Sequence, residues 1–312
     1  MRILIELPTW LGDAVMVSPA LENIIQNYNN PEITIIGSMV STEAIRGHPI
    51  VVKSYVLKKS YLSLFSTVQK LGKFDAFFSF RSSTRSRIFK FLVNSKYKFQ
   101  YKKNKYQGCH QVEKYNRFVN DCVNNAYEAG KLKIFNIHHH PSSSPSKLLG
   151  INPGASYGEA KQWYPQEFAK VAAELSEKYD IQIFGGLKDE KVAKDIEKIL
   201  IEKKVVNFEN FAGKTSVTEL INFISNLDLL ITGDSGPMHL AASFDIPTVT
   251  IFGPTNDIET SQWMNKNSVN IKKNLDCQPC MSRTCPLNHH NCMKQIKANE
   301  VLEAVEFLKN SK

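Results

Sequence analysis

The polar turn Gly233-Asp234-Ser235-Gly236 separates a buried apolar run from a short helical stretch, and this placement suits the binding of an anion. Leu229 to Thr232 predicts a strand, Pro237 to Phe244 a helix, and Thr248 to Phe252 a second strand. A helix that follows a strand directs its unpaired N–H groups and positive dipole end toward the carboxyl edge of the sheet. The segment therefore predicts a βαβ unit that binds the diphosphate of a nucleotide.

Two other motif interpretations are excluded by their surroundings. Gly233 to Pro237 is similar to the nucleophile segment of trypsin-like proteases, but the chain lacks their all-β, disulfide-bearing pattern and their histidine segment. Gly213-Lys214-Thr215 ends like a P-loop, but Phe208 occupies the position of that motif's first glycine. We therefore expect neither serine protease nor P-loop chemistry.

Two further loops follow predicted strands. In the loop from Pro8 to Asp13, Gly12 lets the backbone approach a ligand, and Asp13 fits equally well as a helix N-cap or as a general base. The loop from Asn152 to Trp163 contains small residues, hydroxyls and Lys161, whose charge can neutralise a diphosphate. The alternative for this second loop is an ordinary flexible connection with a surface lysine.

The formal charge of +9 is concentrated in a basic run from Arg81 to Lys105. Such a run suits nucleic acid, an anionic membrane, or an acidic or phosphorylated sugar, and it is equally typical of a solvated face. No nucleic-acid motif accompanies it. Arg81 and Arg85 directly follow the strand predicted at Phe74 to Phe80, so we expect them to reach a ligand and bind its anionic groups.

The chain of 312 residues is 42% hydrophobic and is long enough for two globular domains. Its N-terminus has one early arginine and an apolar run interrupted by Pro8, which predicts a first strand and not a signal peptide. No stretch approaches the roughly 20 apolar residues of a membrane span. We expect a cytoplasmic protein whose six cysteines are mostly reduced.

Strands and helices alternate on both sides of a Pro/Ser-rich segment, residues 138–146. We predict two doubly wound α/β domains, residues 1–145 and 146–312, with ligands in a cleft between the carboxyl edges of their sheets. The histidine triplet of this linker, His138 to His140, is better explained as exposed than as a metal site. The predicted strands are Arg2–Leu7, Ile33–Ile36, Val51–Val56, Phe74–Phe80, Lys96–Tyr101, Leu148–Asn152, Ile181–Phe184, Val205–Phe208, Leu229–Thr232 and Thr248–Phe252. The predicted helices are Ala14–Tyr28, Leu62–Leu71, Gln111–Asn124, Pro165–Tyr179, Glu190–Glu202, Val217–Leu227 and Asn299–Leu308, the last able to pack back on the first domain.

A cysteine cluster lies near the C-terminus, at Cys277, Cys280, Cys285 and Cys292. Its C-x-x-C spacing suits a structural zinc or an iron centre. We favour the alternative, a reduced and partly packed cysteine hairpin.

Four motifs taken together resemble glycosyltransferase family 9, the ADP-heptose:lipopolysaccharide heptosyltransferases. They are Leu11-Gly12-Asp13, the PGAxYGxAKxW pattern from Pro153 to Trp163, the GDSGPMHLAA block from Gly233, and Phe252-Gly253-Pro254-Thr255. They occur in the family's order over essentially the whole chain, and the cysteine-bearing tail is most similar to the heptosyltransferase II branch.

The resemblance implies a GT-B architecture of two Rossmann-like domains and an inverting transfer that needs neither a metal nor a cofactor. The sugar would be L-glycero-D-manno-heptose, moved from ADP-heptose to the first heptose of a Kdo-bearing lipid A core. By the same resemblance Asp13 is the general base, and the donor-binding residues are Ser156, Tyr157, Lys161, Asp234, Ser235, Gly236 and His239. We expect the acceptor to be contacted by Trp10, Gly12, Arg81 and Arg85, and the remaining lysines of the basic run to lie on the anionic inner leaflet of the membrane.

Three alternatives remain open at this point. Heptosyltransferase I or III of the same family would use another acceptor. A sugar-nucleotide epimerase of similar shape would turn over the free sugar nucleotide without an acceptor. A catalytically silent saccharide-binding protein would keep its ligand binding in the Asp13→Ala variant.

Overall fold

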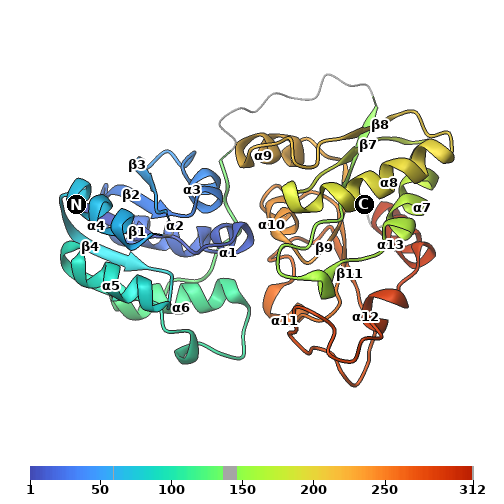
Figure 1. The fold of residues 1–312 in the computed structure, drawn as a ribbon. Helices are drawn as coiled ribbons and strands as arrows, with labels where there is room; N and C mark the ends of the chain where they lie inside the picture. The colour runs from blue at the N-terminus through green and yellow to red at the C-terminus, as the bar shows by residue number, and fades with distance from the viewer. Residues whose placement is uncertain (59, 136–145, 311–312) are drawn as a thin grey trace. The chain divides into compact units, whose positions relative to one another are not determined.

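The computed structural model describes residues 1–58, 60–135 and 146–310. The chain divides into two compact units, residues 1–137 and 138–312 (Figure 1). The histidine triplet and nearly all of the expected linker lie outside the described residues. Each unit is a parallel sheet covered by helices, as the alternation of strand and helix patterns predicts.

The sheet of the first unit has five parallel strands within the described residues, in the order β3-β2-β1-β4-β5. They are β1 (Arg2–Glu6), β2 (Glu32–Gly37), β3 (Val51–Val56), β4 (Lys73–Ser79) and β5 (Asn94–Gln100). The strand order reverses between β1 and β4, and such a switch point opens a ligand site at the carboxyl ends of the strands.

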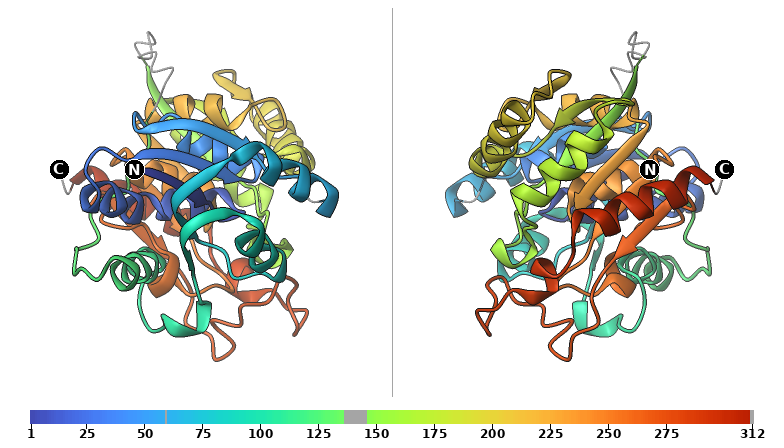
Figure 2. Two further views of the ribbon diagram at one scale, coloured as in Figure 1. Left: turned by 90° about the vertical axis from the view of Figure 1, so that its left-hand side faces the viewer. Right: turned by 90° about the vertical axis from the view of Figure 1, so that its right-hand side faces the viewer.

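The helices of this unit form two groups that contact one another within each group. One group is α1 (Leu11–Met16), α2 (Ser18–Asn27), α3 (Met39–Ile45) and α6 (Gln111–Val123); the other is α4 (Tyr61–Leu71) and α5 (Thr84–Leu92). The crossovers β1-β2-β3 and β3-β4-β5 run in opposite directions along the sheet, and their right-handedness places α1 to α3 on one face and α4 and α5 on the other (Figure 2, left). Helix α6 follows β5 and packs with α1 and α2. A short 3-10 helix, η1 (Lys103–Lys105), follows β5.

The helix predicted from Ala14 to Tyr28 is two helices, because a proline interrupts the backbone ladder. Pro19 has no N–H to donate to the carbonyl of Val15, and the Ser18 hydroxyl donates to that carbonyl instead, at 2.7 Å. The interruption leaves α1 as a short helix of its own that begins at Leu11, so the last three residues of the predicted loop, Leu11 to Asp13, are helical.

The sheet of the second unit has six parallel strands within the described residues, in the order β11-β10-β9-β6-β7-β8. They are β6 (Lys147–Asn152), β7 (Tyr179–Ile183), β8 (Phe208–Asn210), β9 (Leu229–Gly233), β10 (Thr248–Ile251) and β11 (Ser268–Ile271). Helix α7 (Pro165–Leu175) contacts both α8 (Glu190–Glu202) and α13 (Ala298–Asn310), and α9 (Val217–Ser225) contacts α10 (Gly236–Ser243). Short helices are η2 (Glu159–Lys161), η3 (Leu187–Asp189), α11 (Asp257–Thr260) and α12 (Asn291–Lys294).

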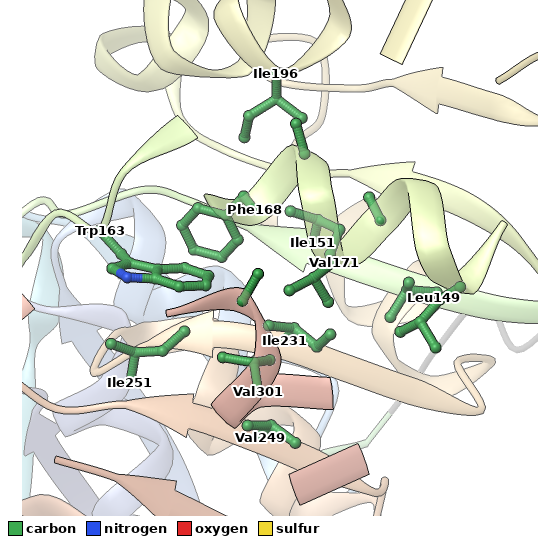
Figure 3. Close-up of a cluster of buried hydrophobic side chains, with 14 of the residues drawn as sticks. Leu149, Ile151, Trp163, Phe168, Val171, Ile196, Ile231, Val249, Ile251 and Val301 are labelled. Carbon is green, nitrogen blue, oxygen red and sulfur yellow. The ribbon is translucent and has the colours of Figure 1, made fainter. Parts of the chain in front are cut away.

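The core of this unit joins its sheet to α7, α8 and α13 (Figure 3). Trp163 is buried there, with its ring centroid 4.7 Å from that of Phe168 and its Nε1 donating to the carbonyl of Ile296 at 3.1 Å. The final helix α13 buries Val301 and Leu308 in this same core and runs beside α7 (Figure 2, right). Trp163 thus anchors the end of the loop that follows β6.

Two predicted boundaries in the second unit are wrong for local reasons. The helix from Pro165 ends at Leu175, because the chain must turn before β7 starts at Tyr179. The strand predicted at Val205 to Phe208 begins only at Phe208: the N–H of Val205 still donates to the carbonyl of Leu200, and Val206 is 89% exposed. In the described part of the chain, no helix is both long and apolar enough to span a bilayer.

Candidate functional site

Both groups of predicted site residues lie at the carboxyl ends of strands next to a switch point. In the first unit they follow β1 and β4, the two strands between which the order reverses. In the second unit they follow β6 and β9, which are paired in the same way. This is the position where open parallel sheets bind ligands.

Asp13 lies in the first turn of α1 and is partly buried. The N-cap of α1 is Trp10, which makes no side-chain capping hydrogen bond, so the interpretation of Asp13 as the N-cap is wrong. The hydroxyl of Tyr115, on α6, donates to Asp13 Oδ1 at 3.1 Å. Asp13 is therefore a carboxylate held by a side chain from a distant part of the chain.

Tyr115 was not identified from the sequence, where it is one aromatic residue on an amphipathic helix. It is buried against Phe80 and Tyr101, with ring centroids 5.5 and 5.2 Å away. Burial, and then the nearby Asp13 charge, raise the pKa of Tyr115 well above 10. The phenol therefore stays protonated at neutral pH and remains a hydrogen-bond donor to the carboxylate.

Trp10 and Gly12 are the remaining candidates after β1. Trp10 is 50% exposed although it is a large aromatic residue, and Gly12 is the second residue of α1. An exposed indole directly before a carboxylate-bearing helix suits contact with a sugar ring.

A buried carboxylate that the sequence analysis missed lies under Arg81. Glu6 ends β1 and is 1% exposed; its Oε2 accepts hydrogen bonds from Ser79 Oγ, at 2.6 Å, and from Ser86 Oγ. Arg81 Nη1 lies 3.8 Å from Glu6 Oε1. Burial raises the pKa of Glu6 above its usual 4.5, against the opposing hydrogen bonds and arginine charges. The one visible signal was an acidic residue at the end of an otherwise apolar strand.

Arg85 has a different set of partners from Arg81. It lies in the first turn of α5, and its Nη2 donates to the backbone carbonyls of Lys58 and, at 3.4 Å, Ser60. Burial, and then the charge of Arg81, lower its pKa. Arg85 thus fixes the segment before α4, while Arg81 is the arginine held at the strand end by Glu6.

In the second unit, Lys161 and Asp234 form an ion pair. Lys161 Nζ lies 2.5 Å from Asp234 Oδ2, and the two side chains are only 12% and 6% exposed. Lys161 also donates to the backbone carbonyl of Asp234 at 3.2 Å, and Thr255 Oγ1 donates to Asp234 Oδ2 at 2.6 Å. The structure therefore joins three of the family-like motifs, from the ends of β6, β9 and β10, through one carboxylate.

The N-terminus of α10 is surrounded by hydroxyl and amide groups. Ser235 is its N-cap, Gly236 its first residue, and His239 is buried within it. The amide of Asn152 donates to Thr232 Oγ1 at 3.0 Å and to Ser235 Oγ at 3.1 Å. Asn152 and Thr232 were assigned to strands from the sequence, and only their polar type at a strand end distinguished them.

Ser156 and Tyr157 form a turn in the loop between β6 and η2, where Ser156 is exposed. Tyr157 donates its hydroxyl proton to the carbonyl of Met281 at 2.6 Å. The N–H of Ala160 donates to the carbonyl of Arg283 at 2.9 Å, and the carbonyl of Ala160 lies 2.9 Å from His290 Nε2. The cysteine-bearing segment, residues 277–292, is thus the surface on which this loop rests.

All six cysteines lie in the described part of the chain and are free thiols. Cys285 accepts a hydrogen bond from the N–H of His290 at 3.4 Å, and backbone hydrogen bonds, His290 first, lower its pKa. Burial, then the neighbouring cysteines, raise the pKa of Cys292 to about 11. Over residues 1–58, 60–135 and 146–310, no three His, Cys, Asp or Glu side chains are arranged to hold a metal ion.

The cavities formed by described residues of the second unit include one far from the predicted site and one beside it. One of about 500 Å³ is lined by Lys147, Tyr179 and Lys309, at the amino-terminal ends of β6 and β7, away from the predicted site. The other, of about 260 Å³, is lined by Gly253 and Thr255 at the carboxyl end of β10. Only the second adjoins the Lys161–Asp234 pair, through Thr255.

Comparison with known proteins gives matches over the whole chain. A family model described as glycosyltransferase family 9 (heptosyltransferase) matches residues 79–291. The lipooligosaccharide heptosyltransferase 2 of Campylobacter jejuni subsp. jejuni serotype O:2 is 40% identical over 320 residues, covering 100% of this chain and 99% of that protein. The lipopolysaccharide heptosyltransferase 2 of Escherichia coli K12 is 28% identical over 177 residues, which cover 56% of this chain and 51% of that protein.

Two solved structures share the fold. The glycosyl transferase family 9 protein from Veillonella parvula superposes with a TM-score of 0.87 at 19% identity, covering 100% of this chain and 98% of that one. The E. coli ADP-heptose lps heptosyltransferase II superposes with a TM-score of 0.82 at 20% identity, covering 99% and 98%. The likeness confirms the predicted architecture of two Rossmann-like sheets.

Proposed function

Because this chain belongs to glycosyltransferase family 9, we propose that it transfers L-glycero-D-manno-heptose from ADP-heptose to the first heptose of a Kdo-bearing lipid A core. The observation that carries this choice of acceptor is the 40% identity, over the full length, to a lipooligosaccharide heptosyltransferase 2. A second candidate is heptosyltransferase I activity, since a lipopolysaccharide heptosyltransferase 1 of Campylobacter coli is 32% identical over 52% of the chain.

The donor is proposed to bind at the second unit's switch point. The amide end of α10, with Ser235 as N-cap and Gly236 as first residue, suits the diphosphate, because unpaired N–H groups and the helix dipole favour negative charge. Ser156 and Tyr157 supply hydroxyls in the adjacent loop, and His239, which is buried within α10, is the remaining proposed donor-binding residue. Lys161, near the end of that loop, is held by its ion pair with Asp234.

The transfer is proposed to be a single displacement with Asp13 as the general base. The acceptor hydroxyl gives its proton to the Asp13 carboxylate, its oxygen bonds to the anomeric carbon, and the bond from that carbon to ADP breaks with its electrons on the departing phosphate. Inversion requires the base on the side opposite to the leaving group. The position of Asp13 and of the donor residues in different units is consistent with that requirement.

The negative charge that develops on ADP is proposed to be stabilised by protein groups, without a divalent ion. The proposed groups are the N-terminus of α10 and the ammonium group of Lys161, because preorganised dipoles and charges stabilise a developing anion. Activity in the presence of EDTA tests the point directly.

The acceptor is proposed to bind at the switch point of the first unit. Arg81, oriented by Glu6 at 3.8 Å, suits the carboxylates of Kdo or a core phosphate, because a guanidinium binds such groups through two parallel hydrogen bonds. Trp10 and Gly12 would contact the sugar itself.

The face formed by α4 and α5 is proposed to touch the cytoplasmic leaflet of the inner membrane. Leu62 on α4 and Phe91 on α5 are 82% and 83% exposed, and the two helices contact each other. Between Val51 and Lys105 the sequence contains many lysines and arginines, and Asp75 is its one acidic residue. Exposed apolar side chains amid basic residues favour an anionic lipid surface.

Vesicle sedimentation tests the membrane proposal. Binding to vesicles rich in phosphatidylglycerol should exceed binding to phosphatidylcholine vesicles and should fall for the Leu62→Ser/Phe91→Ser variant. The matched control is Val206→Ser, which removes an equally exposed apolar residue from the second unit. Equal binding by all three proteins would refute this surface.

Release of ADP from ADP-L-glycero-D-manno-heptose, measured with EDTA present, tests the transferase proposal. Core acceptors with no heptose and with one heptose are compared, for wild type and Asp13→Ala. Release with the one-heptose acceptor, lost in the variant, supports heptosyltransferase II chemistry. Release with the heptose-free acceptor supports heptosyltransferase I, and conversion of the donor without acceptor would indicate an epimerase. Binding without turnover, unchanged in the variant, would indicate a saccharide-binding protein.

A further inference from the structure

We propose that Arg283 is a donor-binding residue that contributes the positive charge which the diphosphate of the sugar nucleotide requires. The inference rests on the proposed function and extends it to a residue outside the four motifs. Three observations lead to it: the neutralisation of Lys161, the placement of Arg283, and its lack of a carboxylate partner.

The charge of Lys161 is already balanced within the protein. Its ammonium group lies 2.5 Å from Asp234 Oδ2, and both side chains are nearly buried. Separating such a pair costs more than a surface pair would, since neither charge can be solvated in place. The pair is electrically neutral as a whole. A diphosphate bound beside it would therefore interact with a dipole and one hydrogen-bond donor, but with little net positive charge.

Arg283 is held next to this pair by the loop from Asn152 to Trp163, called the donor loop from here on. Its guanidinium carbon lies 5.3 Å from the centroid of the Tyr157 ring, and Lys161 Nζ lies 4.8 Å from the same centroid. Both distances are within the range of a cation–π contact. The ring of Tyr157 thus brings the two cations to one place.

The backbone of Arg283 is fixed against the same loop. Its carbonyl accepts a hydrogen bond from the N–H of Ala160 at 2.9 Å, one residue before Lys161. A Cβ built on Gly158 would lie 2.4 Å from that carbonyl oxygen, so the approach requires glycine at this position. Two residues earlier, the carbonyl of Met281 accepts from Tyr157. The loop and Arg283 therefore form one unit.

Arg283 is an exposed residue, and among the described residues no carboxylate forms an ion pair with it. A fully charged group with several donors in a plane is suited to two phosphate oxygens. Arg283 is thus a cation available to the ligand beside one that is committed to the protein.

The test compares ADP and adenosine binding by calorimetry in wild type, Arg283→Ala and Arg283→Lys. Hydrogen bonds to a charged group contribute about 1.5–3 kcal/mol, so the Kd for ADP should rise roughly tenfold to a hundredfold in Arg283→Ala. Adenosine, which has no phosphate, should bind all three proteins alike, and Arg283→Lys should recover part of the ADP affinity. The control is Arg117→Ala, an exposed arginine on α6 of the first unit.

Each other outcome decides the question. Unchanged ADP affinity in Arg283→Ala would overturn the proposal while leaving the proposed function intact. An equal loss for ADP and adenosine would show that the residue only shapes the loop, which also overturns it. If the wild-type protein binds neither ADP nor ADP-heptose, the proposed function fails and this inference fails with it.

Discussion

Replacing Tyr115 with phenylalanine tests whether Asp13 is the base without removing the carboxylate. The change deletes one hydroxyl, which donates to Asp13 Oδ1 at 3.1 Å, and leaves the buried ring against Phe80 and Tyr101. That hydrogen bond stabilises the charged carboxylate, so its loss makes Asp13 easier to protonate. If Asp13 must be ionised for turnover, the acid limb of the pH–rate profile shifts to higher pH.

The size of the shift follows from the length of the bond. Hydrogen bonds to charged groups are worth about 1.5–3 kcal/mol, and strong O–H···O⁻ bonds are shorter than this one, at about 2.5–2.7 Å. The lower value therefore applies, and about 1.4 kcal/mol corresponds to one pH unit. We expect the acid limb to move up by roughly one unit, with a modest loss of kcat at its plateau.

The assay is ADP release across a pH series at saturating donor and acceptor. Tyr106→Phe is the matched control, because it deletes a phenol that donates to another carboxylate, Asp121 Oδ2, at 2.7 Å. The control should leave the acid limb in place. An acid limb that stays unchanged in Tyr115→Phe, in an enzyme that Asp13→Ala inactivates, would refute the role of Asp13 as the titrating base.

Three further predictions concern stability and the donor loop. The raised pKa of Glu6 means that the folded protein binds a proton more tightly at this carboxyl than the unfolded chain does. The free energy of unfolding should therefore fall as the pH rises above about 4.5 through the folded pKa. Urea titrations at several pH values should show that Glu6→Gln removes this part of the slope. Lys161→Met leaves Asp234 buried without its ion-pair partner and should lower the free energy of unfolding by about 3–5 kcal/mol. The double variant Lys161→Met/Asp234→Leu should recover part of that loss, because no unpaired charge remains buried. Equal urea midpoints for the single and double variants would contradict the pairing. Gly158→Ala forces a Cβ toward the carbonyl of Arg283 and should weaken ADP binding in calorimetry, and wild-type affinity in this variant would show that the loop adapts freely.

The fold was largely predictable because central strands of a parallel sheet, such as β9 (Leu229–Gly233), are buried on both faces and are mostly apolar. Strands such as Val51–Val56 and helices such as Glu190–Glu202 have the predicted bounds. Apart from helices of three or four residues, three elements were missed: β11 (Ser268–Ile271) is a four-residue edge strand, and α3 (Met39–Ile45) and α5 (Thr84–Leu92) have only seven and nine residues. Elements this short carry too little local pattern to be predicted.

The site was predictable only where chemistry follows a strand along the chain. Asp13, Lys161 and Asp234 each lie in the segment that directly follows a strand, so sheet topology alone brings them to a carboxyl edge. Partners that come from distant segments gave no local signal: Tyr115 reaches Asp13 across 102 positions, and Arg283 reaches the donor loop from the cysteine-bearing segment. Such contacts depend on tertiary packing, which one sequence does not reveal.

The two units share a common electrostatic arrangement at their separate switch points. In the first unit Glu6 lies beneath Arg81, and in the second unit Asp234 holds Lys161; each cation is oriented by a carboxylate that is almost fully buried. A carboxylate that orients a cation also lowers the net positive charge at that place, so it weakens the attraction that an anionic ligand experiences. The arrangement therefore makes the precise direction of a donor group more important than total charge, and it leaves the attraction of anionic ligands to exposed cations such as Arg283. It also gives the cysteine-bearing segment a role that needs no bound ion: its backbone fixes the donor loop and presents that arginine.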